Sequence, residues 1–393
     1  MTSAHRTATL VIILQLAFIS PQAPALPGLQ AALSQSVSER LKSEAQAQVD
    51  HFLAGGKFPG VTAGITLPDG QSFAVAAGVS NRTTGAAMKT TDRLMQGSVG
   101  KTYVSAVALQ LVTEGKLSLD EKIEKHLGAE SWFPRLPNGK DITVRMLMNH
   151  TSGLVRYEFK EQFTRDLTAA PGKVWKPEEL VAYILDAPAP FPAGRDWQYS
   201  DTNYIVLGMI LEKVAGENYH RLVRQRVLIP FGLTDTIPVE GRVVAGLVQG
   251  YAGPANPFGK TDEMIRSGRF AINPQFEWTG GGMASTSEDL AKWAKLLYEG
   301  KAFDPSLMPE FLDGVPARLG PNTRYGLGVI IRETNLGTSY GHSGFFPGYL
   351  SEMMYFPRYG IAVAVQVNTS ESQKLGMPLG RFLLDLAASI VKP

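Results

Sequence analysis

The pattern of apolar and polar residues predicts a helix followed by a β-hairpin at the start of the chain. Residues 29–54 carry apolar side chains at a helical period among polar neighbours. Residues 61–67 and 72–79 are largely apolar and flank a Pro-Asp-Gly turn at 68–70, which is typical of two paired strands. A further apolar run at residues 98–115 predicts a helix.

The middle of the chain, from about residue 116 to 280, is rich in proline and glycine and predicts short helices joined by loops. Its clearest helical patterns are residues 178–187 and 203–216. Another helix is expected after Ser285-Thr286-Ser287, because each of these hydroxyls can cap a helix N-terminus and two acidic residues follow.

The last third of the chain changes to strand patterns. Strands are predicted at residues 325–333, 338–344, 349–357 and 361–368, and a helix at 379–392. The predicted fold class is therefore α/β, of the α+β type, with one antiparallel sheet built from both ends of the chain. Helices from both termini flank this sheet, and a mostly helical subdomain is inserted in it. We predict one domain, residues 26–393, with a sheet part (about 26–95 and 285–393) and a helical part (about 96–284).

The N-terminus predicts a secretory signal peptide, residues 1–25. His5 and Arg6 precede an apolar run at residues 8–19, and Ala23-Pro24-Ala25 offers a cleavage site. The run is shorter than the roughly 20 residues that a membrane-spanning helix needs. We expect a secreted or periplasmic bacterial protein without a stable membrane span after cleavage.

The composition excludes several classes of function. The formal net charge is only +2, which gives no reason to expect a nucleic-acid partner. Cysteine is absent, so disulfides, thiol nucleophiles and thiolate metal sites are excluded. The six histidines are scattered without a metal-binding spacing, and we expect neither a metal nor another cofactor.

The stretch QGSVGKTY, residues 96–103, admits two interpretations. A phosphate-binding loop needs a glycine five residues before its Gly-Lys pair, and Met95 stands there instead. The alternative is a nucleophile, Ser98, with Lys101 one helical turn away on the same face. The Ser98 N–H would then be an unpaired first-turn donor that can stabilise an oxyanion. Because a lysine acts as a base only when its pKa is lowered, this interpretation needs partners elsewhere in the chain.

Two later stretches supply such partners. WQYSDTNY places Tyr199 two residues before Asp201, and YGHSGFFPGY places His342-Ser343-Gly344 on a predicted strand. Together with Ser98-x-x-Lys101, and in this order, they resemble the serine β-lactamase and penicillin-binding protein superfamily. The similar branch contains class C β-lactamases, D-alanyl-D-alanine carboxypeptidases and family VIII esterases. The resemblance covers about residues 40–390 and includes EGKLSLDEKI, ITVRMLMNHTSGL and GGGMASTSEDLAKW.

The resemblance implies a role for each of these residues. Ser98 would be the acylated nucleophile, Lys101 its proton partner, and Tyr199 a general acid and base. Asp201 stands where asparagine is commoner, and a carboxylate cannot donate a hydrogen bond as an amide does. A pair with Lys101 would keep the lysine protonated, so we expect Asp201 to lie behind the groups that contact substrate. Asn203 is the alternative donor, although a structural role is the stronger expectation.

The second half of the site is expected on the strand with YGHSGFFPGY. His342 stands where many members have lysine, which favours the carboxypeptidase and esterase branches, and its ordinary pKa near 6.5 predicts pH-sensitive activity. Ser343 is expected to hydrogen-bond a substrate carboxylate, and the edge through Gly344 and Phe345 to pair with the substrate backbone. The Phe345 N–H would be the second oxyanion donor.

The resemblance implies an exported serine hydrolase that forms an acyl-enzyme on Ser98. The first expectation is a D-alanyl-D-alanine carboxypeptidase-like enzyme or related peptidase acting on cell-wall-type peptides. The alternatives are a class C-like β-lactamase, a short-chain esterase, or a non-catalytic penicillin- or peptide-binding module. A second serine motif, Gly-x-Ser-x-Gly at residues 337–341, lacks the helix that a nucleophile elbow requires. His150, within NHTSGL, is expected to hold a loop at a helix end.

Overall fold

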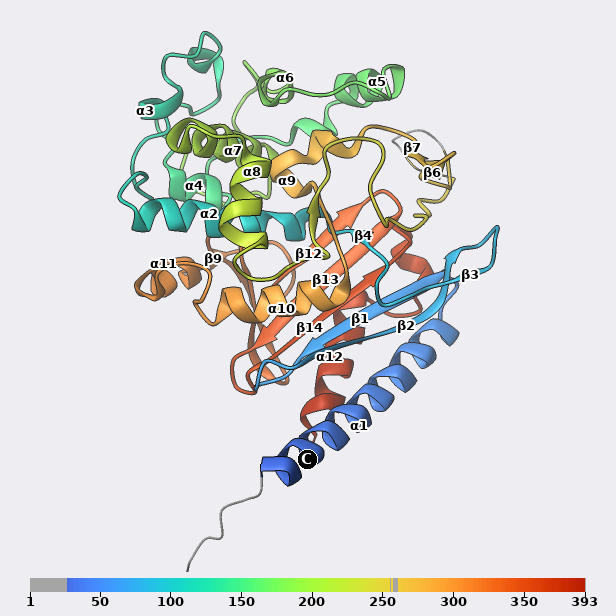
Figure 1. The fold of residues 1–393 in the computed structure, drawn as a ribbon. Coiled ribbons are helices and arrows are strands. Elements are labelled where there is room, and N and C mark those ends of the chain that lie inside the picture. Colours follow the sequence, from blue (N-terminus) through green and yellow to red (C-terminus); the bar gives the residue numbers. More distant parts are fainter. Residues whose placement is uncertain (1–26, 255, 257–260, 393) are drawn as a thin grey trace, which may run out of the picture. The chain divides into compact units, whose positions relative to one another are not determined.

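The computed structural model describes residues 27–254, 256 and 261–392 (Figure 1). The predicted signal peptide, residues 1–25, lies outside the described residues. Contacts within the chain divide it into residues 1–41 and 42–393. Helix α1, Pro27–Ala54, begins in the first unit and ends in the second. Its residues up to 41 are all that the structure describes of the first unit. The predicted start of the catalytic domain at residue 26 stays a prediction.

The second unit is built on a nine-stranded sheet in which every neighbouring pair is antiparallel. The strand order is β3-β2-β1-β14-β13-β12-β11-β10-β9. The predicted N-terminal hairpin forms β1 and β2, and β1 pairs with the last strand, β14, so both ends of the chain build one sheet as predicted. The strands are β1 Gly60–Thr66, β2 Ser72–Asn81, β3 Ala86–Ala87, β9 Val315–Pro316, β10 Thr323–Tyr325, β11 Ile330–Thr334, β12 Gly337–Phe346, β13 Tyr349–Phe356 and β14 Ile361–Val367.

Helices cover both faces of this sheet. Strands β1 and β14 are buried at every position, which requires cover on both sides. Helix α10, Ser287–Tyr298, packs on β1, β13 and β14, and its N-terminal cap is the predicted Thr286. Helix α12, Leu379–Val391, packs on β13 and β14, and its Phe382 stacks on Phe52 of α1 with ring centroids 4.0 Å apart. The predicted flanking helices are confirmed.

The inserted part is mostly helical, as predicted. Helices α2, Lys101–Thr113, and α7, Asp201–Ala215, pack on each other and are largely buried (Figure 1). Within the described ranges, no helix has both the length and the apolar character needed to cross a membrane. The remaining elements are α3 Glu124–Leu127, η2 Phe133–Arg135, α4 Val144–Met148, η3 Tyr157–Phe159, α5 Glu161–Ala169, α6 Pro177–Ala182, α8 Tyr219–Val223, η4 Arg224–Leu228, β6 Ile265–Arg266, β7 Arg269–Phe270, η5 Pro274–Glu277, α9 Trp278–Gly281, η6 Pro305–Leu307, α11 Met308–Leu312 and η7 Ser372–Lys374.

Two predicted elements differ from the structure. The predicted strand 325–333 is interrupted between β10 and β11, because the chain turns at Gly328, whose φ is +87°. A Cβ at this glycine would run into the Ser105 hydroxyl, so the close turn needs glycine. The predicted helix 178–187 is shorter and ends at Ala182.

A small second sheet joins the two ends of the inserted part. It has the order β4-β8-β5, formed by Leu94–Met95, Met283–Ser285 and Ile237–Pro238. Leu94 lies opposite Ser285 in the register. The chain therefore enters and leaves the inserted part through neighbouring strands, near the predicted edges at residues 95 and 285.

Candidate active site

The predicted nucleophile lies in a tight turn that leads directly into a helix. Ser98 is in the 3₁₀ turn η1, Gly97–Gly100, rather than in the predicted α-helix, and Lys101 is the first residue of α2. The Lys101 side chain is fully buried, whereas Ser98 is partly exposed. Lys101 Nζ donates a hydrogen bond to Ser98 Oγ at 3.0 Å. The structure thus brings these two residues together with an accessible hydroxyl.

The turn is held against the main sheet by close backbone contacts. Gly97 has a φ of +52° and lies on the backbone of Phe345 in β12, and a Cβ at Gly97 would overlap it. Gly344 lies against Gln96 in the same way. The Ser351 hydroxyl donates to the Gln96 carbonyl oxygen at 2.6 Å. Ser98 therefore has a fixed position beside β12.

A backbone carbonyl group also holds Lys101. The Gly280 carbonyl oxygen, in α9, accepts a hydrogen bond from Lys101 Nζ. A Cβ at Gly281 would lie 2.6 Å from the backbone of Gly97, so α9 approaches η1 as closely as two backbones can. The Thr279 hydroxyl donates to the Tyr204 carbonyl oxygen at 2.8 Å and fastens α9 to α7. The Gly-Gly-Gly stretch therefore positions the lysine.

Tyr199 lies just before α7, beside this pair. Lys101 Nζ is 5.0 Å from the centre of the Tyr199 ring. The Tyr199 hydroxyl is buried and makes no hydrogen bond to any residue that the structure describes. Burial raises the pKa of this hydroxyl, and the opposing effects of Lys101 and Ser98 are smaller. Tyr199 is therefore a neutral phenol at neutral pH.

Asp201 forms the ion pair with Lys101 that the sequence analysis considered. Its Oδ1 accepts a hydrogen bond from Lys101 Nζ, and both side chains are buried. Burial alone would lower the pKa of Lys101, but Asp201 and Tyr199 raise it above its usual value. Burial alone would raise the pKa of Asp201, but Lys101 and Arg156 bring it below its usual range. Lys101 is thus a cation that donates to Ser98.

Three charged residues of the site were missed by the sequence analysis. Arg156 Nη2 donates to Asp201 Oδ2 at 2.7 Å, and Arg156 Nε pairs with Glu158. Burial and the nearby Asp201 raise the pKa of Glu158 well above its ordinary value. Burial and then Asp201 raise the pKa of Glu277 to about 8. The signals were indirect, since Arg156 and Glu158 follow NHTSGL closely and Glu277 precedes the glycine stretch.

His342 is turned away from solvent and is 1% exposed. Its Nδ1 lies 2.6 Å from the Ser343 carbonyl oxygen and so carries the proton, which leaves Nε2 to accept from the Tyr325 hydroxyl at 2.8 Å. Burial and the charge of Lys101 lower the pKa of His342 to about 3. The expected titration near 6.5 is therefore wrong, because the imidazole is neutral at physiological pH.

Asn203 and His150 form a buried support under the site. The side chain of Asn203 accepts a hydrogen bond from Ser152 and lies 2.9 Å from His150 Nδ1 through its amide nitrogen. The Ser200 N–H also points to His150 Nδ1, at 3.3 Å. Asn203 is fully buried and both of its polar atoms are engaged, so it does not supply the substrate donor that was considered. These contacts support the structural role expected for His150.

A cavity of about 650 Å³ opens in front of Ser98. Phe345, expected at the substrate-binding edge, lines it, and so does Asp201, which was expected to lie behind the groups that contact substrate. The pairing of β11 with β12 ends at Gly341, so the segment of β12 with Ser343 and Gly344 continues past that partner beside the nucleophile turn. The other lining residues are Arg156, Glu158, Phe159, Thr164, Glu277 and Pro347.

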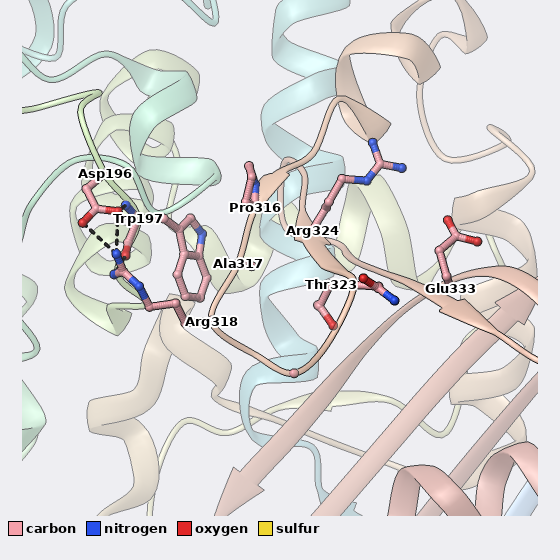
Figure 2. A pocket seen from close by; sticks show the side chains of 10 residues that line it. Asp196, Trp197, Pro316, Ala317, Arg318, Thr323, Arg324 and Glu333 are labelled. Carbon is pink, nitrogen blue, oxygen red and sulfur yellow. Dashed lines mark hydrogen bonds and ion pairs between the residues drawn. The ribbon is translucent and has the colours of Figure 1, made fainter.

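A second cavity, of about 610 Å³, is lined by Asp196 and Trp197 and by residues from the segment 316–333. Ser98 does not line it. Figure 2 shows Asp196 and Arg318, an ion pair at 2.8 Å, on one side, with Arg324 and Glu333 on the other. It contains none of the predicted catalytic residues. We therefore assign the candidate active site to the first cavity.

Comparisons with known proteins identify the family of this chain. The sequence model of the family described as Beta-lactamase matches residues 45–388. Penicillin-binding protein 4 of Amycolatopsis lactamdurans is 26% identical over 83% of this chain and 85% of its own length. Penicillin-binding protein 4* of Bacillus subtilis is 23% identical over 68% of this chain, but only 59% of its own length is matched.

A solved structure is similar over nearly its whole length. The D-stereospecific amidohydrolase from a Streptomyces species has a TM-score of 0.72 and 27% identity, over 85% of this chain and 97% of that one. Its likeness confirms the predicted fold class, and the family match confirms the superfamily identified from the motifs. The chain therefore belongs to the beta-lactamase family.

Proposed function

We propose that this protein is a serine hydrolase that forms an acyl-enzyme on Ser98. The observation that carries the proposal is the 3.0 Å hydrogen bond from buried Lys101 to a partly exposed serine hydroxyl at the wall of a cavity. The fixed positive charge of Lys101 stabilises negative charge that develops on Ser98 Oγ during attack. Each residue then has one role that follows from its protonation state.

Tyr199 moves the proton. Ser98 Oγ attacks the substrate carbonyl carbon while its proton passes to the Tyr199 oxygen, and the Tyr199 proton passes to the leaving group as the scissile bond breaks. Because the phenol gains and loses one proton, it remains neutral, in agreement with its raised pKa. Water then attacks the acyl group by the reverse route and frees Ser98. The N–H groups of Ser98 and Phe345 are the proposed oxyanion donors.

The charges of the cavity favour an amide substrate without a required terminal carboxylate. A carboxypeptidase needs a cation to hold that carboxylate. His342 is neutral at physiological pH, and Arg156 is already paired with Asp201 and Glu158. The name of the Streptomyces amidohydrolase also supports amide hydrolysis. Carboxypeptidase, β-lactamase and esterase activity, and penicillin binding without turnover, become outcomes of the test. Export by the N-terminal segment is proposed from the sequence alone.

The test follows Ser98 by mass spectrometry over time after mixing with a fluorescent penicillin, with an amino-acid p-nitroanilide, and with p-nitrophenyl acetate. Formation of an acyl group on Ser98 supports the proposal, and release of this group by water supports hydrolysis. A permanent penicillin adduct without turnover of any substrate would favour the binding module. Hydrolysis that survives in Ser98→Ala contradicts the mechanism.

A further inference from the structure

Two carboxyl groups in the active-site cavity are not fully partnered, unlike most buried carboxyls: Glu277 has no partner among the described residues, and Glu158 pairs with Arg156 through only one of its oxygens. Glu277 lines the cavity, and its carboxyl group makes no hydrogen bond or ion pair with any described residue. Its pKa is raised by burial and by the charge of Asp201, and no hydrogen bond contributes to this shift. The Glu158 side chain is 8% exposed and lines the same cavity. Its Oε2 is buried and accepts no hydrogen bond within the described part of the chain.

These carboxyls line the same cavity as Asp201, which forms the ion pair with Lys101. A Cβ added to Gly280 would lie 3.7 Å from Glu277 Oε2 and 3.8 Å from Asp201 Oδ1. The Gly280 carbonyl oxygen also accepts from Lys101, which in turn donates to Ser98. A ligand group held by Glu277 would therefore lie close to the scissile carbonyl.

The charges at the site are one cation short. Two cations, Lys101 and Arg156, meet three carboxyls, of Asp201, Glu158 and Glu277. Lys101 is engaged by Ser98, Asp201 and Gly280, and Arg156 by Asp201 and Glu158. Without a further cation the site retains protons, in agreement with the raised pKa values of Glu158 and Glu277. A positively charged group from a ligand would complete the balance.

The mouth of the cavity is apolar. Phe159 is 71% exposed and Phe345 is 54% exposed, and both line the cavity together with Pro347. Arg156 stacks 4.1 Å above the Phe159 ring, which holds this ring in place. Exposed aromatic rings beside a nucleophile suit a bulky apolar substituent on the substrate.

We propose that Glu277 and Glu158 bind the free ammonium group of the substrate. The preferred substrates are then amides of amino acids in which the amine is free and the side chain is bulky and apolar. This rests on the proposed function of Ser98. Glu277 accepts hydrogen bonds from the ammonium group, Glu158 adds its free oxygen, and the two phenylalanines contact the side chain. Blocking the amine as an amide removes the charge that the carboxylates recognise.

The test compares free and N-acetylated phenylalanine p-nitroanilides, in both enantiomers, with the wild type, Glu277→Gln and Glu333→Gln. Glu333 is an exposed glutamate in the second cavity and serves as the matched control. The wild type should prefer the free amine by about tenfold or more in kcat/KM, and Glu277→Gln should lose most of that preference. Glutamine keeps a hydrogen-bond acceptor oxygen but removes the charge, so this variant separates the charge from a neutral hydrogen bond.

A binding measurement keeps the inference testable without turnover or the variant. Phenethylamine and 2-phenylethanol have similar size and differ in charge, and phenethylamine should raise the thermal midpoint of the wild type at a lower concentration. Equal shifts, equal or better cleavage of acetylated substrate, or an unchanged preference in folded Glu277→Gln would each overturn the inference. Substrate turnover that survives in Ser98→Ala would instead contradict the proposed function and leave the ammonium subsite supported by the binding result.

Discussion

Replacing Gly281 by alanine should damage the active site far more than replacing its neighbour, Gly280. A Cβ at position 281 would lie 2.6 Å from the Gly97 carbonyl carbon and oxygen and 3.0 Å from the Ser98 nitrogen. All of these are backbone atoms, so no side-chain rotation relieves the overlap. A Cβ at position 280 meets nothing closer than 3.7 Å. The two variants therefore add the same methyl group in opposite steric situations.

The expected magnitudes follow from this difference. Overpacking of a close contact costs about 1–3 kcal/mol, which is the expected loss in the free energy of unfolding for Gly281→Ala. Gly280→Ala should stay within about 0.5 kcal/mol of the wild type. Movement of α9 also displaces the carbonyl oxygen that holds Lys101, and a misplacement of about 1 Å can slow a catalysed step by roughly 100-fold.

Urea unfolding and the rate at which a fluorescent fluorophosphonate labels Ser98 measure both effects. The labelling rate reports the position of Lys101 behind the serine, and the unfolding curve reports the contact itself. If the two variants are equally stable and equally reactive, the close approach of α9 to η1 does not position the site. A larger loss for Gly280→Ala would contradict the steric argument directly.

Three other predictions concern charge. Asp201→Asn should lower the pKa of Lys101, because burial then acts without the opposing carboxylate, and a pH profile of Ser98 labelling should gain a titration below about pH 10. Glu277→Gln should gain stability relative to the wild type as pH rises from about 5 to 8 in urea titrations. The reason is that the raised pKa of Glu277, about 8, makes the folded wild type bind a proton that the unfolded chain releases, so wild-type stability falls over this range. His342→Gln should leave the shape of the activity profile between pH 5 and 8 unchanged, because the pKa of His342 is lowered to about 3, and a lost inflection near pH 6.5 would contradict this.

The periodic patterns were sufficient to predict most of the sheet and its two long cover helices. Residues 61–67 and 72–79 were predicted as a hairpin because two largely apolar runs flank a Pro-Asp-Gly turn, and they form the paired strands β1 and β2. The break near Gly328 was not visible, since its cause is a contact with Ser105 more than two hundred residues earlier. Local patterns carry no information about such contacts.

The site divides in the same way. Ser98, Lys101 and Tyr199 were found from short motifs and lie together in the structure. The charges around them were not found, because Arg156 lies in a loop and Glu277 at the end of the short helix η5, where no periodic pattern marks them, and both act only through their contacts. The protonation state of His342 was predicted wrongly because burial, which lowers its pKa, depends on the whole fold.

The pairing of Leu94 with Ser285 has a consequence for how such a protein can change. The nucleophile follows one of these strands by only a few residues, and the glycines that hold Lys101 precede the other. Ser98 and the glycines that position Lys101 are thus anchored at the two ends of a long excursion of the chain, and Tyr199 lies within it. Lengthening or exchanging the interior loops that do not carry Tyr199 can alter which compounds enter while the reacting atoms keep their places. The substrate specificity can therefore change while the arrangement of the catalytic residues is kept.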